Sequence, residues 1–287
     1  MPAHPRLHPM VDSLEPGLQR ALAALRRSIA AHPAVLVAYS GGVDSALVAA
    51  IAAEQLGERA LAVTGVSPAL APHLRDEARQ QAAWMNILHR EIPTAELSDP
   101  AYSSNPSDRC YACKRELHSL LARLLEESDT AGTVVLDGVN HDDLSDHRPG
   151  IRAAQERGVH SPLAELGISK TGVRTISRAL GFPWWDKPAQ PCLASRFPYG
   201  EAINAERLQR VAAAEGWLHQ QGFKSLRVRS QGESARIELP PEQLMRLLEA
   251  PLREAVVDTF LALGFTAVSL DLEGLVSGKL NRTLGQP

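Results

Sequence analysis

The chain has 287 residues, of which 44% are hydrophobic and 22% charged, and its formal net charge is −3. This length predicts about two domains with a sizeable core, and the small negative charge argues against general nucleic-acid binding. No stretch approaches the roughly 18 uninterrupted apolar residues that span a bilayer. Because the N-terminal stretch MPAHPRLHPMVDSLEPG has no apolar core, no secretory signal is expected, and we expect a cytoplasmic protein without a membrane partner.

The first half of the chain alternates between helical and strand patterns. Helices are predicted at 14–30, 44–56, 74–85 and 111–127, and strands at 34–39, 60–66, 88–92 and 133–139. Strands that alternate with helices favour an α/β fold with a doubly wound parallel sheet. In such a sheet the ligand lies beyond the carboxyl ends of the strands.

The pattern changes after about Phe182. Residues 182–200 read FPWWDKPAQPCLASRFPYG and are expected to form a long ordered loop. A helix at 204–221, a hairpin turning at Gln231-Gly232, two short helices and a strand at 266–270 then predict a small α+β unit. The sequence therefore predicts two domains, 1–186 and 187–287.

The most informative motif is SGGVDS, between the first predicted strand and its helix. Its residues Ser40, Gly41, Gly42, Asp44 and Ser45 combine hydroxyls, an acid and adjacent glycines that permit positive φ, so backbone N–H groups can line a concavity at a helix N-terminus. A Walker loop would carry a lysine, which is absent here. The motif resembles that of the PP-loop ATP pyrophosphatases, which cleave ATP between the α and β phosphates and adenylate an acceptor. The alternative is a plain glycine turn with Asp44 as a helix cap.

Three cysteines form the second pattern. Cys110 and Cys113 are three residues apart at a predicted helix start, and Cys192 lies in the long loop. An odd number of cysteines in a reducing compartment indicates metal or redox chemistry rather than disulfides.

Several longer segments extend the likeness. The chain resembles the LarE family from about Leu36 to Asn281, because six segments follow one another in the order seen in that family. They are DGVNHDDLSDHRPG (137–150), VHSPLAELGISKTGVR (159–174), WDKPAQPCLASRFPYG (185–200), RVR, ARIE and LDLEGLVSGKLN (270–281). That family comprises the ATP-dependent sulfurtransferases of nickel-pincer nucleotide cofactor synthesis. The resemblance implies a small-molecule nucleotide substrate, pyridinium-3,5-biscarboxylic acid mononucleotide, whose carboxylates are adenylated by ATP and become thiocarboxylates. We also expect a homo-oligomer.

The resemblance implies an arginine site for that substrate. Arg196, Arg227 and Arg229 stand at matching positions, with Ser195 beside the first. Arg227 and Arg229 alternate along a strand and so share one face, and guanidinium groups bind carboxylates and phosphates bidentately. Solvated arginines on an edge strand are the alternative.

Metal and stacking sites are also indicated. Asp142 and Asp143 follow the strand at 133–139, where Mg²⁺ would bridge a carboxylate and the triphosphate; helix capping or surface charge are alternatives. Trp184-Trp185 could stack on a pyridinium ring, or pack at the domain boundary.

The family contains two sulfur chemistries. In one, a single cysteine matching Cys192 gives up its own sulfur; in the other, three cysteines hold a [4Fe-4S] cluster whose fourth iron carries exogenous sulfide. Cys110, Cys113 and Cys192 favour the cluster, with their sulfurs expected within about 7 Å of one another. A zinc ion held with His118 or His141 is a third possibility.

Other functions compete with this one. A PP-loop tRNA thiolase would need a basic, aromatic-bearing surface, an ammonia-using NAD or GMP synthetase would leave the cysteines idle, and an adenine-nucleotide sensor would leave the arginines unexplained.

Overall fold

The structure is a computed structural model that describes residues 9–127, 130–145, 149–276 and 278–284. The chain packs as two units. The first comprises residues 1–67, 74–96 and 110–190, and the second comprises 68–73, 97–109 and 191–287. The division into domains 1–186 and 187–287 stays a prediction. Among the described residues, no helix combines the length and the apolar character needed to cross a membrane.

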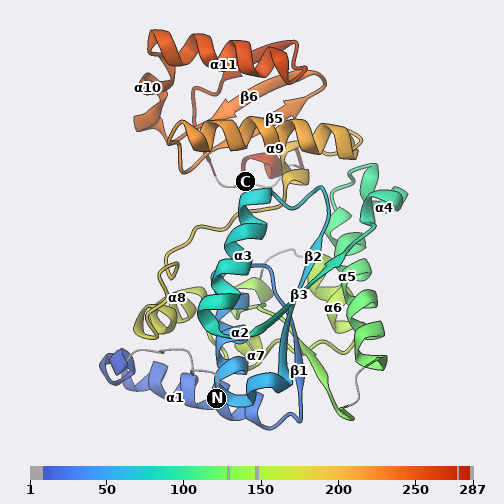
Figure 1. The fold of residues 1–287 in the computed structure, drawn as a ribbon, viewed down its shortest axis with the longest axis vertical. Coiled ribbons are helices and arrows are strands. Elements are labelled where there is room, and N and C mark those ends of the chain that lie inside the picture. Colours follow the sequence, from blue (N-terminus) through green and yellow to red (C-terminus); the bar gives the residue numbers. More distant parts are fainter. Residues whose placement is uncertain (1–8, 128–129, 146–148, 277, 285–287) are drawn as a thin grey trace. The chain divides into compact units, whose positions relative to one another are not determined.

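The part of the chain up to residue 190 alternates helices and strands as predicted from residue 16 to residue 136, after which further helices follow (Figure 1). Its strands are β1 (Val35–Ala38), β2 (Ala60–Val66), β3 (Leu88–Pro93) and β4 (Val134–Leu136), and its helices are α1 (Pro16–Ala30), α2 (Val43–Leu56), α3 (Pro72–Met85), α4 (Pro100–Ser103), α5 (Arg109–Glu126), α6 (Pro149–Gln155), α7 (Pro162–Glu165) and α8 (Lys170–Ala179). Short 3₁₀ helices lie at Pro9–Ser13, Gly57–Arg59, Glu96–Ser98 and Asp142–Leu144.

The first unit is built on a parallel sheet with strand order β3-β2-β1-β4. Strand β1 is buried on both faces because its side chains alternate between two cores. Val35 and Val37 pack with α1, α2, α3 and α8, whereas Leu36 and Ala38 pack with Leu121 of α5. Helices therefore cover both faces, and the predicted doubly wound α/β fold is confirmed.

The second unit contains a separate three-stranded sheet. Its elements are the 3₁₀ helix Leu193–Arg196, α9 (Ala205–Gln220), β5 (Arg227–Gln231), β6 (Ser234–Glu238), the 3₁₀ helix Pro241–Gln243, α10 (Leu244–Leu248), α11 (Ala250–Ala262), β7 (Ala267–Leu270) and the 3₁₀ helix Lys279–Leu284. Strand β6 pairs antiparallel with β5 and parallel with β7. The small α+β unit predicted from the sequence is thus present.

The hairpin turn lies one residue later than predicted. Gln231 pairs with Ser234, so the turn residues are Gly232 and Glu233 rather than Gln231 and Gly232. Gly232 has a φ of +54°, a conformation that a two-residue hairpin turn requires and that glycine adopts without steric cost. The register leaves Arg227, Arg229 and Gln231 on one face of β5.

Candidate active site

The SGGVDS loop connects β1 to the N-terminus of α2 and is braced by its own serines. Ser45 Oγ accepts the Ser40 backbone N–H at 3.2 Å and lies 3.1 Å from Ser40 Oγ. Ser45 Oγ is also 3.1 Å from the carbonyl oxygen of Gly42, the residue that caps α2. Gly41 has a φ of +71°. The loop therefore presents two hydroxyls and a helix N-terminus at the carboxyl edge of the sheet, an arrangement suited to an anion.

Two glycines at this loop, Gly41 and Gly138, have neighbours that leave little or no room for a side chain. A Cβ on Gly138, just after β4, would lie 2.5 Å from the backbone nitrogen of Ser45, and a Cβ on Gly41 would lie 3.1 Å from the Cβ of Ala78 in α3. The end of β4 therefore touches the first turn of α2 directly. Asp137, beside this contact, is buried, and its burial raises the pKa of the carboxyl group.

An amide and two acids from the loop after β4 extend the site. Asn140 Nδ2 donates to Asp44 Oδ1 at 3.2 Å and to Asp143 Oδ2 at 2.9 Å. Asp142, the predicted magnesium ligand, is exposed, and its Oδ2 accepts the backbone N–H of Lys170 at 2.9 Å. Asp142 thus accepts the first backbone N–H of α8, whose N-cap is Ser169, and its role as a magnesium ligand stays a prediction.

Two lysines that the sequence analysis did not single out lie against the loop. Lys170 Nζ forms an ion pair with Asp44 Oδ2. Lys187 Nζ donates to the carbonyl oxygen of Gly41 at 3.1 Å and pairs with Glu77 at 2.6 Å. Lys170 is 126 residues from Asp44 and Lys187 is 146 residues from Gly41 in the sequence. A motif of neighbouring residues therefore could not have predicted that these lysines lie at the loop.

The tryptophan pair packs within the first unit. The Trp184 ring lies 5.1 Å from that of Trp84 and 5.2 Å from that of Phe182, centroid to centroid. Arg178 lies over the Trp185 ring at 5.0 Å. Trp184 therefore packs inside the first unit rather than at a domain boundary, and stacking of the pair on a pyridinium ring stays a prediction.

The cysteines are divided between the two units. Cys110 is exposed and Cys113 half-buried on the first turn of α5, whereas Cys192, also half-buried, immediately precedes the 3₁₀ helix Leu193–Arg196 of the second unit. None of these three forms a disulfide. Within the described parts of the chain, no group of three or more His, Cys, Asp or Glu side chains is arranged to hold a metal ion.

The two histidines proposed as zinc ligands differ in their surroundings. His118 on α5 is buried, and burial together with Lys114 and Arg157 lowers its pKa to about 3. His141 is exposed, and its backbone N–H donates to the carbonyl oxygen of Ile168. Neither belongs to a metal-binding group among the described residues.

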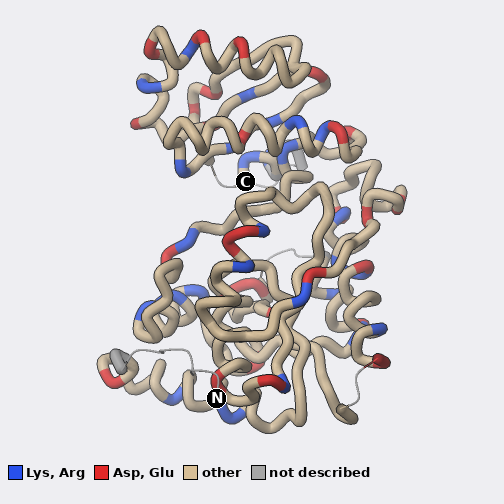
Figure 2. Tube along the Cα trace, in the orientation of Figure 1, with Lys and Arg blue, Asp and Glu red and all other residues tan. Residues whose placement is uncertain are grey.

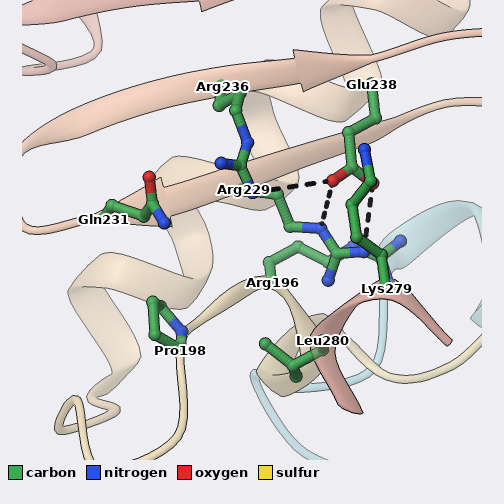
Figure 3. A pocket seen from close by; sticks show the side chains of 8 residues that line it. All are labelled: Arg196, Pro198, Arg229, Gln231, Arg236, Glu238, Lys279 and Leu280. Atoms are coloured by element: carbon green, nitrogen blue, oxygen red, sulfur yellow. Dashed lines mark hydrogen bonds and ion pairs between the residues drawn. The ribbon is translucent and has the colours of Figure 1, made fainter. Parts of the chain in front are cut away.

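Two of the three predicted arginines, Arg196 and Arg229, line one pocket of the second unit (Figure 3). A pocket with an empty volume of about 400 Å³, partly open to solvent, is lined by Arg196, Pro198, Arg229, Gln231, Arg236, Glu238, Lys279 and Leu280. Arg196 and Arg229 are buried and ion-paired to Glu215 and Glu238, so they are not solvated edge-strand residues. Figure 2 shows the basic residues of β5 and the segments beside it.

Arg227 differs from the other two arginines. It is half-buried, and its Nη1 donates to the carbonyl oxygen of Val276 at 3.3 Å. Burial, and then the positive charges of Arg229 and Arg196, lower the pKa of Arg227. A cation held near two other cations is stabilised by any anion that approaches it.

Known proteins resemble this chain over most of its length. No family model matches the chain. It is 53% identical to an uncharacterized protein of Synechocystis over 93% of this chain and 99% of that protein. It is 36% identical to the pyridinium-3,5-bisthiocarboxylic acid mononucleotide synthase of Lactiplantibacillus plantarum, over 87% of this chain and 90% of that one. It is also 27% identical to part of the glutamine-hydrolyzing GMP synthase of Methanosphaerula palustris, over 58% of this chain and 56% of that polypeptide.

The parallel sheet with SGGVDS at the carboxyl end of β1 is a PP-loop α/β domain. The chain belongs to the LarE family, because its similarity to the Lactiplantibacillus synthase spans both units.

Proposed function

We propose that this protein is an ATP-dependent sulfurtransferase that converts the carboxylates of pyridinium-3,5-biscarboxylic acid mononucleotide into thiocarboxylates. The observation that carries the proposal is the similarity to the Lactiplantibacillus synthase at 36% identity over 87% of the chain. That relative is named for the synthesis of a bisthiocarboxylic acid mononucleotide, so its product contains the groups that this reaction would form.

The reaction needs an activation step because a carboxylate oxygen is a poor leaving group. Attack of the carboxylate on the α-phosphorus of ATP would form an acyl-adenylate and release pyrophosphate. Ser40, Gly41, Gly42 and Ser45 would hold the phosphates at the N-terminus of α2. Lys170 and Lys187 support this role because they place cations at the two sides of a loop that contains no lysine.

Magnesium would neutralise part of the triphosphate charge. Mg²⁺ in nucleotide sites is usually bound by one or two carboxylates together with phosphates and water. The exposed carboxylate of Asp142 and that of Asp44, which Asn140 and Lys170 orient, supply such oxygen donors at the carboxyl edge of the sheet. These residues fit a site that is completed by the nucleotide rather than by protein alone.

The arginine group would bind the substrate. Arg227 is the best-suited member, because burial and then two neighbouring guanidinium groups disfavour its charge, and a bound anion would stabilise it. Arg229 lies on the same strand face as Arg227, and its Nη1 donates to the carbonyl oxygen of Ser195. Arg196 Nη1 donates to the hydroxyl oxygen of the same serine. Carboxylates and a phosphate are the groups that such a pocket recognises.

Sulfur would then attack the acyl carbon, and AMP would leave with the electron pair of the broken C–O bond. Thiolates are the usual ligands of iron–sulfur clusters, and the chain offers three thiols outside disulfides, two of them three residues apart on one helix. Cys110, Cys113 and Cys192 would hold the [4Fe-4S] cluster, which would supply a sulfide as the nucleophile. The alternative within the same reaction is that Cys192 donates its own sulfur.

The proposal is tested by incubating the purified protein with ATP, Mg²⁺ and the biscarboxylic mononucleotide. AMP and pyrophosphate should form only when the mononucleotide is present. An adenine-nucleotide sensor would bind ATP without forming either product, and a tRNA thiolase would require tRNA in place of the mononucleotide. Either result would contradict the proposal.

A further inference from the structure

Two carboxylates of the second unit are buried against arginines. Glu215, on α9, is 2% exposed, and Glu238, on β6, is 0% exposed. Arg196 donates from Nε and Nη2 to the two oxygens of Glu215 at 2.8 and 3.0 Å. Arg229 donates to both oxygens of Glu238 at 3.0 Å (Figure 3). Each pair is bidentate, so the carboxylate fixes the plane of its guanidinium group.

The remaining nitrogen of each guanidinium contacts the turn that carries Cys192. Arg196 Nη1 donates to the carbonyl oxygen of Pro191 at 3.0 Å and to Ser195 Oγ at 2.9 Å, and lies 3.5 Å from the carbonyl oxygen of Cys192. Arg229 Nη1 donates to the carbonyl oxygen of Ser195 at 2.6 Å. The two arginines therefore hold the backbone on both sides of the Cys192 thiol.

Stability alone does not account for this arrangement. Replacing a buried ion pair by well-packed apolar residues is often neutral or stabilising, because removing two charges from water costs more than their attraction returns. An apolar pair, however, offers no donors to backbone carbonyls. A guanidinium group has five N–H donors in a fixed fork, so it can bind a carboxylate along one edge and carbonyl groups along another.

We propose that Glu215 and Glu238 are positioning residues for the Cys192 thiol. They orient Arg196 and Arg229, and these arginines fix the turn at 191–195 so that the thiol keeps one direction. The inference rests on the proposed function only for the reason why direction matters. As a cluster ligand Cys192 must point at one iron, and as a sulfur donor it must point at one carbonyl carbon, and small displacements of reacting groups slow such an attack.

The test measures how fast iodoacetamide alkylates Cys192 in the full chain. Cys110→Ser and Cys113→Ser are introduced first, which leaves Cys192 as the sole cysteine. Glu215→Gln and Glu238→Gln keep the side-chain size but remove the charge that orients the arginine. We expect alkylation to become roughly tenfold faster, the factor given by loss of one charge-assisted hydrogen bond, in protein that is still folded by circular dichroism.

The matched control is Glu54→Gln in the first unit. Glu54 forms a bidentate pair with Arg26 at 2.8 and 2.9 Å, so its loss tests the general effect of breaking such a pair and should leave the alkylation rate unchanged. If a glutamine variant does not fold, Arg229→Lys replaces it: lysine keeps the charge facing Glu238 but cannot also reach Ser195, and faster alkylation is again expected. Folded variants with unchanged or slower alkylation would overturn the inference. Because alkylation requires neither ATP nor substrate, the result is independent of the sulfur-insertion reaction.

Discussion

Lys187 Nζ lies 3.1 Å from the carbonyl oxygen of Gly41, although 146 residues separate the two in the sequence. The same ammonium group pairs with Glu77 of α3. A cation is therefore held against a loop whose six residues, Ser40 to Ser45, include none. In a Walker loop the lysine belongs to the motif itself. Here the lysine next to the loop belongs to the segment that follows Trp184, whose ring packs on Trp84 and Phe182.

Lys187→Met is expected to weaken ATP binding by roughly tenfold or more, the range for losing a hydrogen bond to a charged group. Isothermal titration with a non-hydrolysable ATP analogue measures the affinity. Lys187→Arg keeps the positive charge and should retain part of the affinity. The control is Lys224→Met, at an exposed position of the second unit, which should bind normally. Equal affinities for Lys187→Met and the control would show that Lys187 only pairs with Glu77.

Gly42→Ala separates folding from nucleotide binding. An added Cβ would meet only Ser40 Oγ, at 3.4 Å, so the loop itself can accept it, and the change from glycine to alanine at a helix cap costs at most about 1 kcal/mol. The new methyl group would, however, lie where the phosphates are expected. We expect normal thermal unfolding together with lost ATP binding. Gly216→Ala on α9, with open space around it, should change neither, and a Gly42→Ala variant that still binds ATP would place the phosphates elsewhere.

The three cysteines distinguish the two sulfur chemistries. If they hold one cluster, Cys110→Ser, Cys113→Ser and Cys192→Ser should each lower the iron and sulfide content of protein purified without oxygen, because thiolates are the usual ligands of such clusters. Assay of iron and acid-labile sulfide measures this. If only Cys192→Ser abolishes product formation, and the wild-type chain loses the mass of H₂S after one turnover, Cys192 is instead the sulfur donor.

Acid stability should depend on Glu91 in β3. Hydrogen bonds from Arg75 and then Arg79 lower its pKa to about 2 from a usual value of 4.5. Between these two values the unfolded chain binds more protons than the folded protein, so the stabilising contribution is present above pH 4.5 and is lost as the pH falls toward 2. Urea denaturation of Glu91→Gln should therefore show a shallower loss of stability below pH 4.5 than wild type. Exposed Glu58→Gln should keep the wild-type slope, and identical slopes for all three proteins would contradict the assignment.

The sequence predicted the fold well because its signals are local. Strand β2 was predicted with its observed bounds, 60–66, since apolar residues flanked by turns define it. Strand β4 ends at Leu136, earlier than predicted, because the chain leaves the sheet there and Gly138 packs against the first turn of α2. This contact joins residues far apart in the sequence, so local patterns could not predict it. The hairpin turn was predicted one residue too early, because Gln231-Gly232 and Gly232-Glu233 both contain the glycine that a two-residue turn favours.

The candidate site was predicted only in part. SGGVDS could be recognised because its residues are adjacent, and Arg196 and Arg229 because they match family segments. Lys170, Lys187, Glu215 and Glu238 could not be found in this way, because each contacts a residue from another element. The guanidinium groups predicted to bind substrate are also occupied by buried carboxylates, which spacing along a strand does not reveal.

The central claim is that the protein converts carboxylates of pyridinium-3,5-biscarboxylic acid mononucleotide into thiocarboxylates at the expense of ATP. Mass spectrometry of the small molecules tests it most directly, after anaerobic incubation of the protein with ATP, Mg²⁺, sulfide and the mononucleotide. We expect a product whose mass has risen by the exchange of one oxygen for one sulfur, with one AMP formed for each exchange. A mononucleotide of unchanged mass, recovered from a reaction in which folded protein has bound ATP, would contradict it.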